Sequence, residues 1–185
     1  MNEAETNNPW TTLNTKSAYQ NPWIEIEHHD VLTPAGNPGI YGVVKFKNLA
    51  IGIIPLDKDN YTWIVGQYRY PHKKYSWEIP EGGGPIGIDP LDSAKRELLE
   101  ECGIIATNWE LILEMDLSNS ATDERALLYV ARDLSFTHSE PEETEDLQVK
   151  KIPFSELFER VMDGSITDAM TVGAVLKLQH LLNRK

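Results

Sequence analysis

The chain has 185 residues, is 41% hydrophobic and carries a formal net charge of −12 at pH 7. Its length suits one domain with a sizeable core, and its hydrophobic fraction argues against general disorder. The acidic balance argues against nucleic acid or an anionic membrane as a partner, because both require a basic surface.

Hydrophobic patterning and turn residues predict the elements in chain order. Residues 1–20 are expected to form a disordered or extended tail, and residues 21–185 a single domain. Strands are expected at 23–32, 41–46, 50–55, 61–68, 77–79, 109–117, 126–131 and 147–152. Helices are expected at 90–102, at 155–162 and at 167–183. This order predicts an α/β or α+β fold in which few helices flank a mixed sheet.

Neither a signal peptide nor an apolar run of membrane-spanning length is apparent in the sequence. We therefore expect a cytoplasmic protein with no membrane partner. The five histidines lack the spacing of metal ligands, so they receive no catalytic role.

A segment rich in glycine and proline, residues 80–87, precedes the first expected helix. Its composition opposes regular structure and lets the backbone approach a ligand closely. Asp89 is expected as the helix N-cap, with Pro90 at the first helical position and Gly103 just past the end. The single cysteine, Cys102, falls on the apolar stripe of this helix and is expected to be a small core residue.

Three glutamates and an arginine share the expected helix. Glu97 and Glu101 lie one turn apart, and Glu100 lies on the adjacent row. Like charges this close destabilise a helix unless a positive charge lies among them. Mg²⁺ or Mn²⁺ would suit the cluster, since both take carboxylate and carbonyl oxygens. The alternative is an exposed acidic helix face.

The helix and the glycine-rich segment together resemble the Nudix hydrolases. The family's motif, the Nudix box, is Gly, five residues, Glu, seven residues, then Arg-Glu-apolar-any-Glu-Glu-any-Gly-apolar. The positions that match it are Gly82, Arg96, Glu97, Leu98, Glu100, Glu101, Gly103 and Ile104. Ile88 stands where the first glutamate belongs. In the family that glutamate usually braces the box arginine, so its replacement leaves the anchoring of Arg96 open.

Other segments are similar to one branch of that family, the hydrolases of ADP-ribose and nucleoside-diphosphate sugars. These segments are residues 67–71, 77–80 and 143–147. The loop at 118–125 departs from the ADP-ribose pattern, because Asn119 replaces an expected proline. Nucleotide sugars other than ADP-ribose therefore stay open. The resemblance implies a Nudix α/β/α sandwich with a mixed central sheet and an N-terminal strand extension.

The resemblance also implies the metal ligands and the catalytic residues. Glu97 and Glu101 would bind metal through their side chains, and Glu81 through its backbone carbonyl. Glu100 would complete the metal cluster or would be a solvated helix residue, and Arg96 would orient the cluster. Glu143 is the expected general base and Glu145 a further metal ligand, although these two roles could be exchanged.

Three further residues are candidates for binding substrate. Arg69 would clamp a phosphate, because its planar fork suits phosphoryl oxygens, or would form an ion pair at the end of a strand. Trp23 would stack on a nucleobase or would pack under the sheet, and Glu124 would contact the nucleoside or would simply be exposed. The resemblance implies a homodimer in which an early strand of the partner subunit helps to hold the base.

The function that the resemblance implies is Mg²⁺-dependent hydrolysis of a nucleotide sugar, with Mn²⁺ as the alternative metal. A pyrophosphate bond of the ADP-ribose or GDP-mannose type would be cleaved to a nucleoside monophosphate and a sugar phosphate. A Nudix-like module that binds a nucleotide sugar without cleaving it is the alternative, supported by Ile88. A protein-interaction scaffold has little support beyond the acidic surface.

Overall fold

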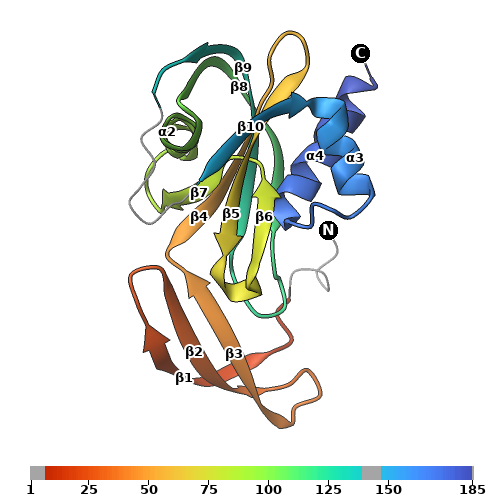
Figure 1. The fold of residues 1–185 in the computed structure, drawn as a ribbon. Coiled ribbons are helices and arrows are strands. Elements are labelled where there is room, and N and C mark those ends of the chain that lie inside the picture. Colours follow the sequence, from red (N-terminus) through yellow and green to blue (C-terminus); the bar gives the residue numbers. More distant parts are fainter. Residues whose placement is uncertain (1–6, 139–146, 185) are drawn as a thin grey trace. The chain divides into compact units, whose positions relative to one another are not determined.

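The computed structural model describes residues 7–138 and 147–184, and the chain divides into two compact units. The first unit comprises residues up to Lys47 together with Ser118–Glu124. The second comprises Asn48–Leu117 and residues from Arg125 onward. Figure 1 shows residues 7–47 of the first unit in red to orange, and every helix among the described residues belongs to the second unit.

The first unit is a three-stranded antiparallel sheet in the order β1-β2-β3. Its strands are β1 (Thr11–Gln20), β2 (Ile24–Leu32) and β3 (Pro38–Phe46). Residues 11–20, expected as a disordered or extended tail, thus pair with β2. The returning segment 118–124 is fixed to β3, since the Val44 N–H donates to the Ala121 carbonyl over 2.9 Å. An ion pair of 2.6 Å between Lys45 and Asp123 adds to this attachment.

The described residues of the second unit form two sheets and three α-helices. One sheet has the order β10-β5-β6, and the other has the order β7-β4-β9-β8 with β4 and β9 parallel. The strands before the first helix are β4 (Asn48–Pro55), β5 (Tyr61–Arg69), β6 (Lys74–Glu78) and β7 (Glu81–Pro85), with a 3₁₀ turn, η1 (Tyr70–His72). The later elements are α2 (Pro90–Cys102), β8 (Ile104–Asp116), β9 (Arg125–Phe136), β10 (Gln148–Pro153), α3 (Phe154–Met162) and α4 (Ala169–Leu182).

Alternation along β4 builds a core on each face of its sheet. Ile51 and Ile53 pack with Leu98 of α2, whereas Ile54 packs with Val175 of α4 and its neighbours. Figure 1 shows α2 on one side of these strands and α3 and α4 on the other. The expected fold, an α/β/α arrangement around a mixed sheet, is confirmed.

The structure corrects the expectation that residues 80–87 lack regular structure. Residues Glu81–Pro85 form β7, which pairs antiparallel with the start of β4. Glycine suits this strand because α2 packs closely on it. A Cβ at Gly84 would come within 3.0 Å of Ile51 and 3.2 Å of the Ser93 hydroxyl. The glycines therefore let a strand and a helix approach, rather than break the strand.

Strand β8 also begins earlier and β9 ends later than expected, because they pair along most of their lengths from Ile104↔Phe136 to Asp116↔Arg125.

Within the described ranges, no helix combines the length and apolar character needed to cross a membrane.

Candidate functional site

Helix α2 has the ends that the sequence predicts. Asp89 Oδ1 accepts a hydrogen bond of 2.9 Å from the Leu91 N–H, and Pro90 occupies the first turn. Gly103 ends the helix with φ 63°, a left-handed conformation that favours glycine. The buried Leu98 fixes the helix against the core, and this orientation turns Glu97 and Glu101 inward as well.

Two box carboxylates are buried against β7. Glu97 is 7% exposed and Glu101 2% exposed, which excludes the solvated acidic face as their role. Glu101 Oε2 accepts a hydrogen bond of 3.0 Å from the Glu81 N–H. A Cβ at Gly82 would overlap the Glu97 carboxylate, so only glycine leaves room for that carboxylate. The box glycine and glutamates thus meet at the start of β7.

Arg96 is anchored although residue 88 is not a glutamate. Its Nη1 donates to Glu100 Oε2 over 2.7 Å, and its Nη2 donates to the Gly83 carbonyl over 2.9 Å and to Glu97 Oε1. Burial alone would lower the pKa of Arg96, but the charges of Glu97 and Glu100 raise it. Ile88 is 54% exposed. Its position carries no brace, and the arginine is held by other partners.

Arg69, at the end of β5, forms an ion pair with two carboxylates. Its Nε lies 2.9 Å from both carboxylate oxygens of Glu78, and its Nη2 contacts Glu78 and Glu81. Hydrogen bonding to Glu78 raises the pKa of Arg69 further above its ordinary value. The ion pair expected as one alternative is therefore present, and the phosphate clamp stays a prediction.

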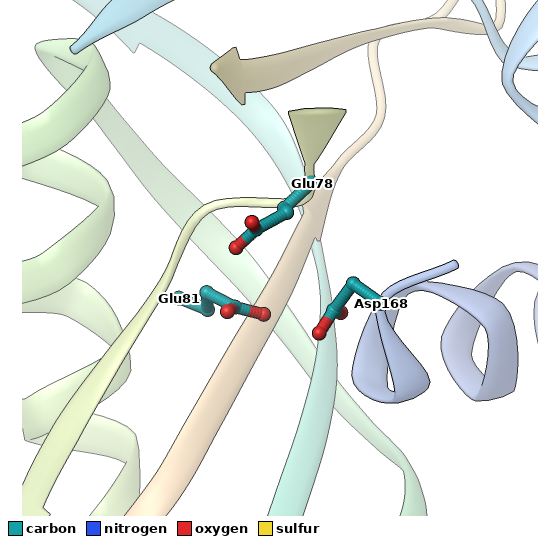
Figure 2. Close-up of side chains that lie close together, drawn as sticks. All are labelled: Glu78, Glu81 and Asp168. Atoms are coloured by element: carbon teal, nitrogen blue, oxygen red, sulfur yellow. The ribbon is translucent and has the colours of Figure 1, made fainter. Parts of the chain in front are cut away.

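A second acidic cluster comprises Glu78, Glu81 and Asp168, which we call the β6–β7–α4 cluster. Each offers one carboxylate oxygen within 4.8 Å of the others. Figure 2 shows the three side chains converging from the end of β6, the start of β7 and the residue before α4. Asp168 is the N-cap of α4, because Oδ2 accepts from the Thr171 N–H over 2.7 Å. The Thr171 hydroxyl in turn accepts from the Ile79 N–H over 3.0 Å, which ties α4 to this segment.

The environment drives the pKa values of Glu78 and Glu81 apart. Burial raises the pKa of Glu81 well above its ordinary value, and the charges of Asp168 and Glu78 add to the rise. Burial also works to raise the pKa of Glu78, but hydrogen bonding with Arg69 and Glu81 and the charge of Arg69 together outweigh it, and the pKa lies below its ordinary value. A split of this kind in one cluster is typical of functional sites, although structural ion pairs produce it too.

The remaining predicted site residues are Glu143, Glu145, Trp23 and Glu124. Glu143 and Glu145 fall outside the described residues. Trp23 and Glu124 belong to the first unit. Trp23 is 64% exposed, so the alternative expectation, that it packs under the sheet, is wrong. Glu124 is half-buried, and burial raises its pKa.

Glu78 and Asp168 carry the part of the site that the sequence analysis missed. Glu78 lies in the Trp-Glu-Ile-Pro segment that supported the resemblance, and that segment was its only signal. Asp168 is a helix cap, and its proximity to Glu81 arises from tertiary packing. Cys102, the last residue of α2, packs against the core as expected, and burial raises the pKa of its thiol.

Comparisons with known proteins agree with this geometry. Residues 46–169 match the family described as NUDIX domain, and residues 10–44 match the one described as Nucleoside diphosphate sugar hydrolase N-terminal domain. A methanol dehydrogenase activator of Bacillus methanolicus is 30% identical over 94% of this chain and 96% of its own. An ADP-ribose pyrophosphatase of Mycobacterium tuberculosis is 27% identical over 89% of this chain and 81% of its own. A crystal structure of an ADP compounds hydrolase shares the fold, with a TM-score of 0.84, 22% identity and 94% of each chain covered. With its box residues gathered at one strand and most of its length matched, this chain belongs to the Nudix family.

Proposed function

We propose that the protein hydrolyses the pyrophosphate bond of a nucleoside-diphosphate sugar with the aid of Mg²⁺, giving a nucleoside monophosphate and a sugar phosphate. The observation that carries the proposal is the burial of Glu97 and Glu101 against a strand whose glycine leaves room for a carboxylate. A protein that only binds nucleotide sugars has no evident use for two buried acids, which cost stability unless they are compensated.

Nudix enzymes generally use a divalent metal, and the residues present fit one. Glu97, Glu101 and the Glu81 carbonyl would hold it, with Glu100 at the edge of the group, because all offer the oxygen atoms that hard cations prefer. Bound there, the metal would neutralise phosphate charge and lower the pKa of a water. Mn²⁺ has the same ligand preference and is the alternative.

The chain's own residues supply orientation and charge. Arg96 donates one hydrogen bond to Glu97 and one to Glu100 and so holds both in place, and we assign it a positioning role. Arg69 would contact a phosphate once it exchanges an oxygen of Glu78 or Glu81 for a phosphoryl oxygen. Glu143 and Glu145 are proposed to supply the general base and a further metal ligand, in either assignment. Positioning and electrostatic stabilisation would then provide most of the rate acceleration.

The relatives support a nucleotide-sugar substrate without fixing which one. The relative from Mycobacterium tuberculosis is named an ADP-ribose pyrophosphatase. Asn119 replaces the proline expected for ADP-ribose enzymes, so GDP-mannose and similar nucleotide sugars are candidate substrates as well. Glu124 is proposed to contact the nucleoside.

We also propose that the protein is a homodimer in which the sheet of the first unit forms part of the contact. All ten residues of β1 are exposed, and Trp23 and Ile40 are exposed on the same unit. Large apolar side chains left in water favour a protein contact. Trp23 would then stack on a base held with the partner. Sedimentation should give twice the chain mass, and Trp23→Ala should raise KM more than it lowers kcat.

The central test is turnover of ADP-ribose, GDP-mannose and UDP-glucose with and without Mg²⁺. We expect metal-dependent release of a nucleoside monophosphate from at least one of them. Glu101→Gln should abolish turnover and leave the fold intact, whereas the exposed control Glu110→Gln should retain full activity. Binding without turnover would replace the enzyme with a sensor, and full activity of Glu101→Gln would refute the ligand assignment.

Three further expectations stay predictions: a tail at 1–20 followed by one domain at 21–185, a cytoplasmic location, and the absence of a nucleic-acid partner.

A further inference from the structure

The β6–β7–α4 cluster is separate from the acids of the Nudix box. Successive side chains of a strand point to opposite faces, and the Cβ position of Gly82 faces Glu97. The side chain of Glu81 therefore leaves β7 on the other face, where it meets Glu78 and Asp168 (Figure 2). Glu81 thus contributes its backbone to one acidic group and its side chain to another.

One oxygen of this cluster is buried without a hydrogen-bond donor. The Glu81 side chain is 7% exposed, and its Oε1 accepts from Arg69. Its Oε2 has no hydrogen-bond partner among the residues that the structure describes. A buried carboxylate oxygen left in this way is costly, so the site needs a proton or a cation at that position.

Arg69 does not balance the charge of the cluster. Its guanidinium pairs with both oxygens of Glu78 and one oxygen of Glu81, and it supplies one positive charge against three carboxylates. Two negative charges remain when all three acids are ionised. A divalent cation would balance them, whereas one shared proton would remove only one charge.

The spacing of the three acids fits a common ion. Their oxygens lie within 4.8 Å of one another, and opposite ligands of a cation bound at about 2.4 Å are separated by about the same distance. We propose that Glu78, Glu81 and Asp168 bind a second divalent cation of the Mg²⁺, Mn²⁺ and Ca²⁺ class, at a site distinct from the Nudix box. The Glu81 oxygen without a hydrogen-bond donor among the described residues is the anchor of this site, and Glu78 and Asp168 each supply a further carboxylate oxygen.

The test counts bound Mn²⁺ by electron paramagnetic resonance on the full chain, without substrate. Wild type should bind about one Mn²⁺ more per chain than Glu81→Gln or Asp168→Asn. Asparagine can still cap α4, so Asp168→Asn should fold. Glu101→Gln, a variant of the box, should retain the cluster's ion, and Glu110→Gln should match wild type.

Two results would overturn the inference. If Glu81→Gln and Asp168→Asn bind as much Mn²⁺ as wild type, a proton rather than a cation occupies the cluster. If Glu101→Gln loses all bound Mn²⁺, the protein has one site at the box only. Neither result bears on nucleotide-sugar turnover, so failure of the second site is distinct from failure of the proposed function.

Discussion

Two fully buried threonines should respond differently to the same substitution. The Thr171 hydroxyl accepts a hydrogen bond of 3.0 Å from the Ile79 N–H, and both residues are 0% exposed. Valine has nearly the same shape, so Thr171→Val would remove the acceptor and leave a buried N–H unpaired. This loss should cost about 1–3 kcal/mol. The Thr62 hydroxyl is buried without a partner among the described residues. Thr62→Val should therefore leave stability unchanged or raise it by about 1 kcal/mol.

The measurement is equilibrium unfolding in urea at one protein concentration, since association would shift the midpoint. Thr171→Val should lower the midpoint with an unchanged slope, and its melting temperature should fall by about 2–4 °C per kcal/mol. Equal losses in Thr171→Val and Thr62→Val would refute the reasoning, because methyl-for-hydroxyl replacement would then matter more than hydrogen bonding. An unaffected Thr171→Val would show that the Ile79 N–H finds another acceptor.

Three further predictions concern the acidic sites. Gly82→Ala should cost about 1–3 kcal/mol and weaken Mn²⁺ binding, because its Cβ would overlap Glu97. Gly83→Ala, whose Cβ would meet only ordinary contacts at 3.4 Å or more, is the control in calorimetric titration. With chelator present, Glu81→Gln should gain stability relative to wild type as pH rises above 4.5, the ordinary pKa of the acid. The raised pKa makes the folded wild type keep its proton at pH values where the unfolded chain has lost it. The free energy of unfolding of wild type therefore falls by up to about 1.4 kcal/mol per pH unit in that window. Parallel curves of unfolding free energy against pH for the two proteins would contradict this prediction. Ile88→Glu should change stability by no more than about 0.5 kcal/mol in thermal melts, since the side chain is exposed; a large loss would mean that the position is packed.

Local patterns predicted most of the second unit. The bounds of α2 follow from its cap, its first-turn proline and its terminal glycine, all of which act within a few residues. Spacing and context singled out Glu97 and Glu101 as site residues, but only the structure shows that both are buried against β7. Strand β7 was missed because its glycines indicate a loop in isolation, and only the packing of α2 on the strand explains them.

Elements that depend on distant partners could not be read in the same way. Strand β1 has no buried residue, so its sequence lacks the hydrophobic alternation that indicates a strand. The segment is a strand because it pairs with β2. The β6–β7–α4 cluster brings together residues about ninety positions apart in the sequence. Local sequence spacing cannot indicate that residues so far apart are neighbours in the fold. The choice between ion pair and phosphate clamp at Arg69 likewise required coordinates, because both use the same guanidinium geometry.

The anchoring of Arg96 has a consequence for how such chains are recognised. The Gly83 carbonyl and Glu100 both accept hydrogen bonds from the Arg96 guanidinium. Arg96 therefore does not need a carboxylate at position 88, and Ile88 is exposed to solvent. Substitutions at that position can accumulate without disturbing the buried acids. A sequence search that requires a carboxylate at that position would miss proteins whose box arginine is anchored in this way. A search based on the glycine-rich strand and the buried glutamates would find them.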